Sequence, residues 1–111
     1  MAAKYRVREI VPDLLAMLKT RVMFKADFQK NEQIIAALGQ IGDTAAIPTL
    51  VKLAKSGGLF HQEELVHMKQ VLFASLQGYP RDDLGQLLNI GQDSKDQIIR
   101  SACRKITIKA N

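Results

Sequence analysis

The segment HQEELVH, from His61 to His67, gathers the side chains best suited to metal binding or acid–base chemistry. Glu63 and His67 are four residues apart and therefore share one face of a helix, whereas His61 and His67 are six apart and point to different sides. This is not the HExxH pattern, in which both histidines share a face and bind zinc. We therefore expect a solvated helix start with acids near its positive end, and no metal site.

The single cysteine, Cys103, lies on an apolar helical stripe beside Arg100, Arg104 and Lys105. Neighbouring cations can lower the pKa of a thiol, but a lone helical cysteine usually behaves as a small buried hydrophobe, and we predict the latter. One cysteine cannot form an intramolecular disulfide, so a reducing compartment, the cytoplasm, is the expected location.

The remaining patterns that resemble catalytic motifs have structural explanations. The adjacent acids Asp82 and Asp83 follow a Tyr-Pro-Arg stop and are expected to cap and begin the next helix. The Gly57-Gly58 pair lacks the strand and the lysine-serine sequence of a phosphate-binding loop. The sequence thus predicts no catalytic residue, metal ligand or cofactor, and gives no positive support for an enzyme.

The net charge of +5 is unevenly distributed along the chain. Residues 1–30 and 95–111 each carry +4, while residues 31–94 carry −3. Basic side chains can attract an acidic peptide or a phosphate, although a solvated face is the ordinary alternative. If their helices line one concave face, five of these side chains are candidates for binding a partner: Lys30, Lys69, Arg100, Arg104 and Lys105.

Neither export nor membrane insertion is expected. Basic residues interrupt the first eleven positions, where a secretory signal needs an apolar core, and 18 apolar residues never run together. A chain of 111 residues forms one domain that buries about 65% of its unfolded surface.

Apolar residues recur at helical spacing almost everywhere, and no alternating stretch of strand length stands out. Gly42 lies where a helix end favours positive φ, and Asp43 is placed to cap the next helix. Similar corners occur at Ser56–Gly58 and Gly78–Pro80, and Asp93 is expected to cap the last helix.

The helices repeat. Val11–Lys19 aligns with Ile47–Lys55 at an offset of 36, and a weaker copy begins at Asp82. The second helices align at an offset of 38, which places Ala36 under Ala74. Such a period indicates stacked helix pairs in one domain, 1–111, with repeats at about 5–42, 43–79 and 80–109.

The sequences ALGQIGD, at Ala37–Asp43, and AIPTLVKL, at Ala46–Leu53, resemble the HEAT repeat in the short bacterial form that phycobilin lyases also contain. The resemblance implies an all-α fold, a short α-solenoid of about three HEAT-like helix pairs. The stretches Thr20–Asn31 and Ser56–His67 are longer than this family usually allows. They are either extra helical turns or loops, and they are the first places to look for a specific function.

The leading interpretation is a non-catalytic protein–protein interaction or scaffold module, whose partner is another protein with an acidic surface or peptide. The chain would be the whole protein or part of a larger one. Two alternatives come from the resemblance: a chromophore-handling protein like the phycobilin lyases, or a nucleic-acid-binding protein, since HEAT-like repeats also build certain alkylpurine DNA glycosylases. In the second case the basic ends would contact phosphates.

Overall fold

The computed structural model describes residues 9–18, 25–56 and 61–109, with side chains described as far as Lys105. This part of the chain is helical and contains no strand. None of the helices it contains is long and apolar enough to cross a membrane. The α-helices are α2 (Val11–Met17), α3 (Lys25–Ile41), α4 (Ile47–Lys55), α5 (Gln62–Ser75), α6 (Gly85–Gln92) and α7 (Gln97–Lys109). Short 3-10 turns occur at η1 (Thr44–Ala46), η2 (Leu76–Gly78) and η3 (Arg81–Asp83).

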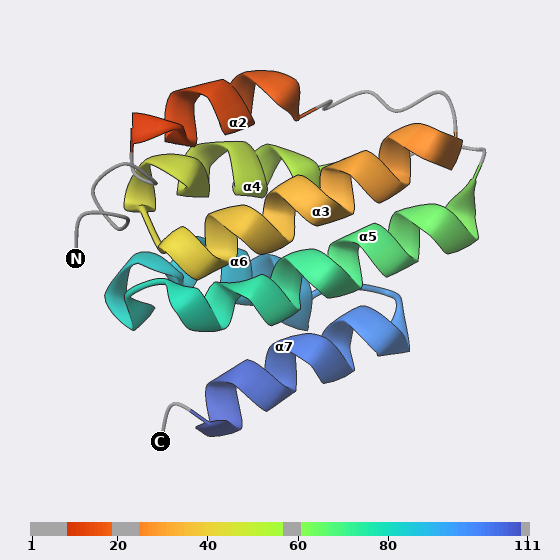
Figure 1. The fold of residues 1–111 in the computed structure, drawn as a ribbon. Coiled ribbons are helices and arrows are strands. Elements are labelled where there is room, and N and C mark those ends of the chain that lie inside the picture. Colours follow the sequence, from red (N-terminus) through yellow and green to blue (C-terminus); the bar gives the residue numbers. More distant parts are fainter. Residues whose placement is uncertain (1–8, 19–24, 57–60, 110–111) are drawn as a thin grey trace.

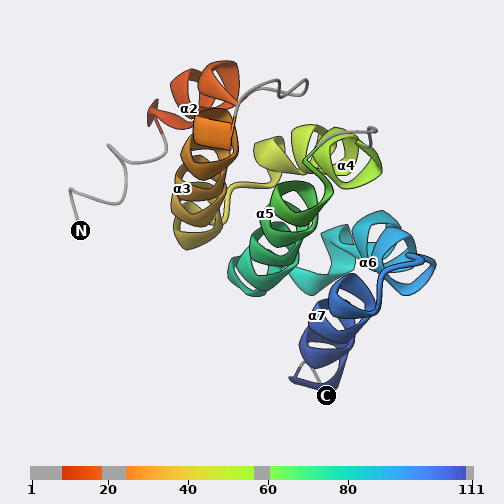
Figure 2. The ribbon, with the colours of Figure 1, turned by 90° about the vertical axis from the view of Figure 1, so that its right-hand side faces the viewer.

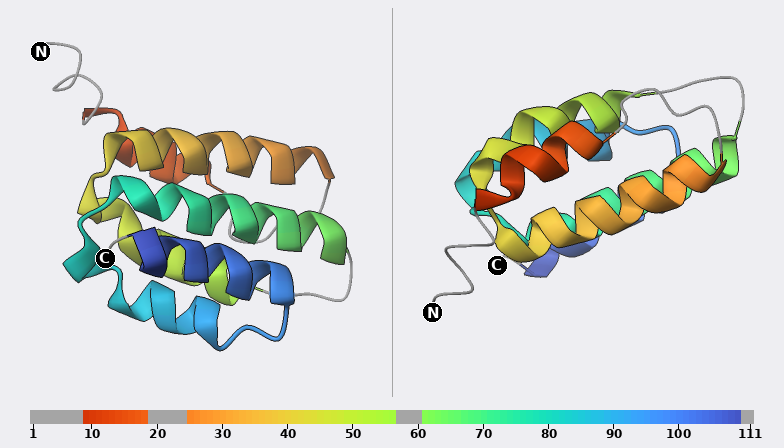
Figure 3. Two further views of the ribbon diagram at one scale, coloured as in Figure 1. Left: turned by 90° about the horizontal axis from the view of Figure 1, so that it is seen from below. Right: turned by 45° about the horizontal axis from the view of Figure 1, so that its top comes forward.

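The helices form two layers (Figure 1; Figure 2). The short helices α2, α4 and α6 make one layer, and the longer helices α3, α5 and α7 make the other. Within the long-helix layer, α3 packs on α5 and α5 packs on α7, and the three run side by side (Figure 3). Each short helix leads into the long helix of its own pair, which confirms the predicted all-α stack of three helix pairs.

The corner between α3 and α4 forms as its sequence predicts. Gly42 has a φ of +72°, and its amide donates to the Leu38 carbonyl at 2.9 Å. The Asp43 carboxylate accepts a hydrogen bond from the Ala45 amide at 2.9 Å, so it caps the turn η1, which continues directly into α4. Pro48 lies in the first positions of α4, where a missing amide donor costs nothing.

Two of the predicted caps are wrong. Asp93 ends α6, and α7 is instead started by Asp96, whose carboxylate accepts from the Ile98 amide at 2.8 Å. Asp82 and Asp83 lie in the 3-10 turn η3 and give no side-chain cap to α6, which begins after Leu84. The turns before α6 and before α7 are both longer than the apolar spacing suggests. Each of these helices therefore begins later in the sequence than predicted.

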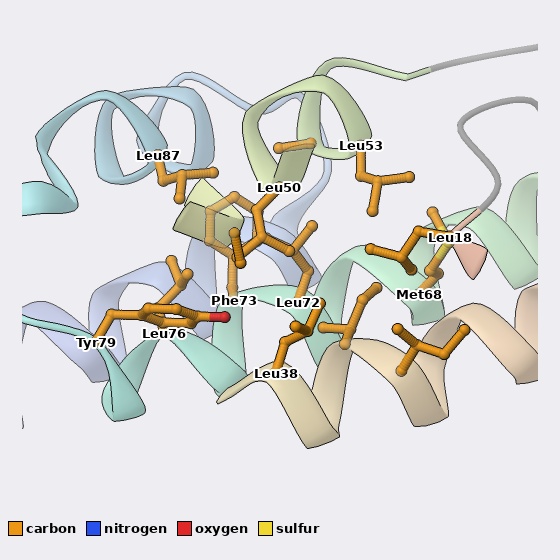
Figure 4. Close-up of a cluster of buried hydrophobic side chains, with 14 of the residues drawn as sticks. Leu18, Leu38, Leu50, Leu53, Met68, Leu72, Phe73, Leu76, Tyr79 and Leu87 are labelled. Atoms are coloured by element: carbon orange, nitrogen blue, oxygen red, sulfur yellow. The ribbon is translucent and has the colours of Figure 1, made fainter. Parts of the chain in front are cut away.

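The core lies between the two layers (Figure 4). Leu50 and Leu53 from α4 meet Leu72 and Phe73 from α5, and all four are fully buried. Leu87 of α6 is also fully buried. Burying a leucine or phenylalanine side chain contributes roughly 1.5–3 kcal/mol, so these contacts hold the layers together.

Tyr79 closes one end of this core (Figure 4). It is 6% exposed, and its hydroxyl has no hydrogen-bond partner within the described part of the chain. Burial raises the pKa of Tyr79 to about 12, and the negative charge of Asp43 acts in the same direction. The hydroxyl is therefore a polar atom held in an unfavourable environment.

The two long stretches singled out in the sequence are helical wherever they are described. Lys25–Asn31 forms the first turns of α3, and Gln62–His67 forms the first turns of α5. Residues 20–24 and 57–60 of these stretches lie outside the described residues. The extra turns make the second helix of each pair longer than the first: α3 has 17 residues and α5 has 14, against 7 in α2 and 9 in α4.

Candidate functional site

A groove runs between α5 and α7 on the face of the long-helix layer. It consists of two hollows of about 430 and 390 Å³, which share the lining residues Gln70 and Ile98 and therefore adjoin each other. In the larger hollow α5 contributes Gln70 and Ala74, η2 contributes Gln77, and α7 contributes Gln97, Ile98, Ser101, Ala102 and Lys105. The smaller hollow is lined by Gln62, Glu63, Val66, His67, Gln70, Asp96 and Ile98. Both hollows fall within the size range of ligand sites.

Helical spacing explains why these residues meet. Positions 62, 66, 70 and 74 of α5 follow one another at four residues and so form one stripe along the helix, and Gln77 in the turn η2 extends that stripe. Ala74, Ser101 and Ala102 are small, which leaves space between the two helices at the larger hollow. Ile98 is 49% exposed, an unusual degree for an apolar side chain inside a groove.

The charges of the groove differ between its ends. Lys105 is the charged residue that lines the larger hollow. The smaller hollow is bordered by the carboxylates Glu63 and Asp96 and by His67. Both acids belong to helix starts, where they also interact favourably with the backbone dipoles: Glu63 lies in the first turn of α5, and Asp96 accepts from the Ile98 amide.

The five basic residues that the sequence proposes for partner binding have different surroundings in the structure. Lys105 lines the groove, while Lys30 is exposed on α3 and Arg104 is exposed on α7. The Arg100 Nη1 donates to the Ser94 carbonyl at 2.7 Å and so braces the turn before α7. Lys69 is half-buried on α5: burial lowers its pKa, and the negative charge of Asp96 partly counteracts that effect.

The other seam of the same layer, between α3 and α5, is closed by backbone contact at one end. A Cβ atom on Gly78 would lie 1.7 Å from the Gly39 carbonyl oxygen, and one on Gly39 would lie 2.8 Å from the Ser75 Cβ. A Cβ on Gly42 would lie 2.2 Å from the Gly78 carbonyl oxygen. Glycine is therefore required at these positions for the two helix ends to approach so closely.

The opposite end of the α3–α5 seam is joined by side chains from the extra helical turns. The Lys25 Nζ lies 3.5 Å from a Glu64 carboxylate oxygen, and the His67 Nδ1 contacts the Glu32 carboxylate. The ring of Phe28 meets the ring of His61 edge-on, with centroids 5.9 Å apart. The Asn31 amide donates to the Met68 sulfur at 3.6 Å.

The HQEELVH segment is a helix start, as its sequence predicts. Glu63 and Glu64 lie in the first turn of α5, and a hydrogen bond from the backbone together with the charge of Lys25 holds the pKa of Glu64 below its ordinary value. His61 and His67 face different neighbours, Phe28 and Glu32. Among the described residues, no three His, Cys, Asp or Glu side chains are arranged to hold a metal ion.

Cys103 is fully buried, as its position on the apolar stripe predicts. Its thiol donates to the Leu88 carbonyl at 3.3 Å, and burial raises the thiol pKa. A cysteine in this environment packs α7 against α6 and is unreactive.

The groove itself was not among the sequence predictions. Its residues include the neutral amides Gln70, Gln77 and Gln97, which carry no charge or metal-ligand pattern that draws attention. The signal is present as a stripe of polar and small residues on α5, opposite the leucines. This stripe can be recognised as part of a groove only when the structure shows which side of α5 faces α7.

The fold and the groove define a class, an all-α helical repeat protein with an open inter-repeat surface. Residues 32–56, which run from the middle of α3 to the end of α4, match the family model of the PBS lyase HEAT-like repeat. This segment is therefore similar to a HEAT-like repeat, and the stacked helix pairs of the described residues agree with a fold of that kind. No curated protein and no solved structure matched the chain.

Proposed function

We propose that this protein is a non-catalytic interaction module that binds another protein in the groove between α5 and α7. The observation that carries the proposal is the groove itself, a continuous surface in which the apolar side chain of Ile98 is half exposed. Exposed apolar side chains in a concave surface with polar edges are typical of binding sites.

The chemistry of the lining favours binding over catalysis. The larger hollow presents three amides, a hydroxyl, a lysine and small apolar side chains. Catalysis of acyl transfer or hydrolysis needs a nucleophile that a neighbouring base activates, and this lining offers no such pair. Groups of the kind present here position a partner through hydrogen bonds and shape.

The proposal is tested by affinity capture from a lysate of the source organism, using Ala74→Arg as the blocked variant. Ala74 is exposed on α5 and lines the larger hollow, so an arginine there fills the groove without entering the core. The matched control is Ala36→Arg on α3, because Ala36 is also exposed and occupies the equivalent position one repeat earlier. A discrete protein that wild type and Ala36→Arg retain, and that Ala74→Arg loses, supports the proposal.

Nuclease treatment and salt separate this function from the nucleic-acid alternative. Phosphate contacts release counterions, so a complex with nucleic acid weakens steeply as salt rises. Captured material that disappears after nuclease treatment would contradict the proposal. It would indicate instead that the protein binds nucleic acid through its basic ends. A spectral change on mixing with a bilin would favour the chromophore-handling alternative instead.

A further inference from the structure

We propose that the occupant of the groove is an extended peptide segment of the partner, bound through its backbone by Gln70, Gln77 and Gln97. In this proposal an acidic side chain of the peptide lies at Lys105 and a basic one lies at the end formed by Glu63 and Asp96. The inference rests on the proposed interaction function and specifies the chemistry of the partner.

The three amides favour a peptide backbone as the ligand. A glutamine side chain both donates and accepts hydrogen bonds, which matches the N–H and C=O of a peptide group. Within the described part of the chain, none of these three side chains has a hydrogen-bond partner. They are therefore available to a ligand.

The same chemistry favours an extended segment over a helix. The backbone groups of a helix are already paired within the helix, so it offers few of them to glutamine side chains. An extended chain exposes all of its backbone donors and acceptors. The long-helix layer presents no strand edge to pair with such a chain, so the side-chain amides have to supply the hydrogen bonds.

The length of the groove sets the length of the segment. Gln62 at the start of α5 and Gln77 in the turn η2 that follows α5 mark its two ends. At a rise of about 1.5 Å per helical residue they are separated by about 22 Å. An extended peptide covers about 3.3 Å per residue, so about seven residues fill the groove. Ile98 borders both hollows and would contact an apolar side chain near the middle of that segment.

Charge gives the segment a direction. α5 and α7 run in the same direction (Figure 3). Their starts, with Glu63 and Asp96, therefore lie at one end of the groove, and Lys105, nine residues further along the chain than Asp96, lies toward the other end. Lys69 is close enough to Asp96 to offset part of its charge, and His67 is engaged by Glu32. Glu63 is thus the acid most available to a basic residue of the peptide.

The experiment selects peptides from a phage-displayed library of random heptapeptides on the full chain. Binders are depleted on the Ala74→Arg variant before each round, so the selection reports on the groove. We expect the enriched sequences to carry an acidic residue toward one end and a basic residue toward the other, with an apolar residue between them. The best sequence is then synthesised with a fluorescent label, and its affinity is measured by fluorescence anisotropy.

Two variants test the assigned roles. Lys105→Glu should weaken binding of the selected peptide by about fivefold, the scale of an exposed ion pair. Gln70→Ala combined with Gln77→Ala should weaken it by about tenfold, since the hydrogen bonds of both side chains to the peptide are lost. The controls are Lys52→Glu on α4 and Gln86→Ala on α6, both exposed on the other layer, and both should leave the affinity unchanged.

The outcomes separate this inference from the proposed function. If no peptide is enriched, or if the amide and lysine variants bind the selected peptide as tightly as wild type, the inference is wrong. The interaction function survives that result if lysate capture still yields a protein that Ala74→Arg loses, because the partner then presents a folded surface. Failure of capture together with failure of selection overturns both.

Discussion

The two seams of the long-helix layer solve the same packing problem in different ways. Between α3 and α5 the helix ends meet backbone to backbone at Gly39 and Gly78, and side chains join the other end. Between α5 and α7 small side chains leave two connected hollows. One repeat fold thus supplies both a tight structural joint and a binding surface, and the difference depends on a few residues at each seam.

Replacing Gly78 with alanine should break the closed seam and have the largest effect. The new Cβ would lie 1.7 Å from the Gly39 carbonyl oxygen, so the two helix ends have to separate. We expect the free energy of unfolding to fall by about 3 kcal/mol, the upper end of overpacking costs. Urea denaturation followed by circular dichroism measures the change.

The control for this substitution is Gly85→Ala, because a Cβ at Gly85 would meet nothing within 4 Å. Gly85 is the first residue of α6, where alanine should leave stability unchanged or raise it by up to about 1 kcal/mol. Equal losses for the two variants would contradict the assignment of the α3–α5 seam as a backbone contact.

Tyr79→Phe sharpens the description of the same seam, because Tyr79 directly follows Gly78. Removing a buried hydroxyl that has no partner in the described part of the chain should raise the free energy of unfolding by about 1 kcal/mol. A destabilised phenylalanine variant would show that the hydroxyl is satisfied in solution.

The tyrosine also predicts a dependence on alkaline pH. Its pKa is about 12 in the folded protein against 10.0 ordinarily, so above pH 10 the unfolded state ionises first and is stabilised. Wild type should therefore lose stability between pH 10 and pH 12 more steeply than Tyr79→Phe. The measurement is the unfolding free energy of both proteins across this pH window. Parallel dependences on pH would contradict the burial of the Tyr79 hydroxyl.

Glu32→Gln tests the side-chain end of the closed seam. The Glu32 side chain is 17% exposed and contacts His67 across the seam. We expect a loss of about 0.5–1 kcal/mol at low ionic strength, and a smaller loss in high salt. A double-mutant cycle with His67→Ala measures the interaction energy between the two side chains. A coupling energy of zero would show that this contact does not stabilise the seam.

Ala74→Leu should have the smallest effect on stability because it adds volume to the open groove. We expect a change within about 0.5 kcal/mol, as for surface substitutions elsewhere. Urea denaturation followed by circular dichroism again measures the change. A loss comparable with that of Gly78→Ala would mean that α5 and α7 pack as closely as α3 and α5 do.

The sequence predicts local structure better than it predicts the groove. Gly42 and Asp43 mark their corner because positive φ and a capping carboxylate are properties of single residues. The start of α7 was misplaced because Asp93 and Asp96 are both plausible caps, and only the path of the intervening turn decides between them.

The groove depends on how α5 and α7 pack against each other, and the sequence of neither helix alone specifies that packing. The burial of Lys69 beside Asp96 and the use of Arg100 to brace a turn remove these two residues from the exposed basic set. Lys105 is exposed and lines the groove between α5 and α7. Gln70 and Gln77 can be recognised as site residues only when the structure shows the hollow that the small side chains of Ala74 and Ala102 leave between α5 and α7.

The glycine contacts of the α3–α5 seam have a consequence for how such a protein can evolve. Steric exclusion at Gly39, Gly42 and Gly78 leaves those positions almost no tolerated alternative, whatever the protein binds. The side chains along the α5–α7 groove are exposed or half-exposed, and most substitutions there cost little stability. Residues of the α5–α7 groove can therefore change during evolution while the α3–α5 seam stays the same. New binding specificities can then arise without a change of fold.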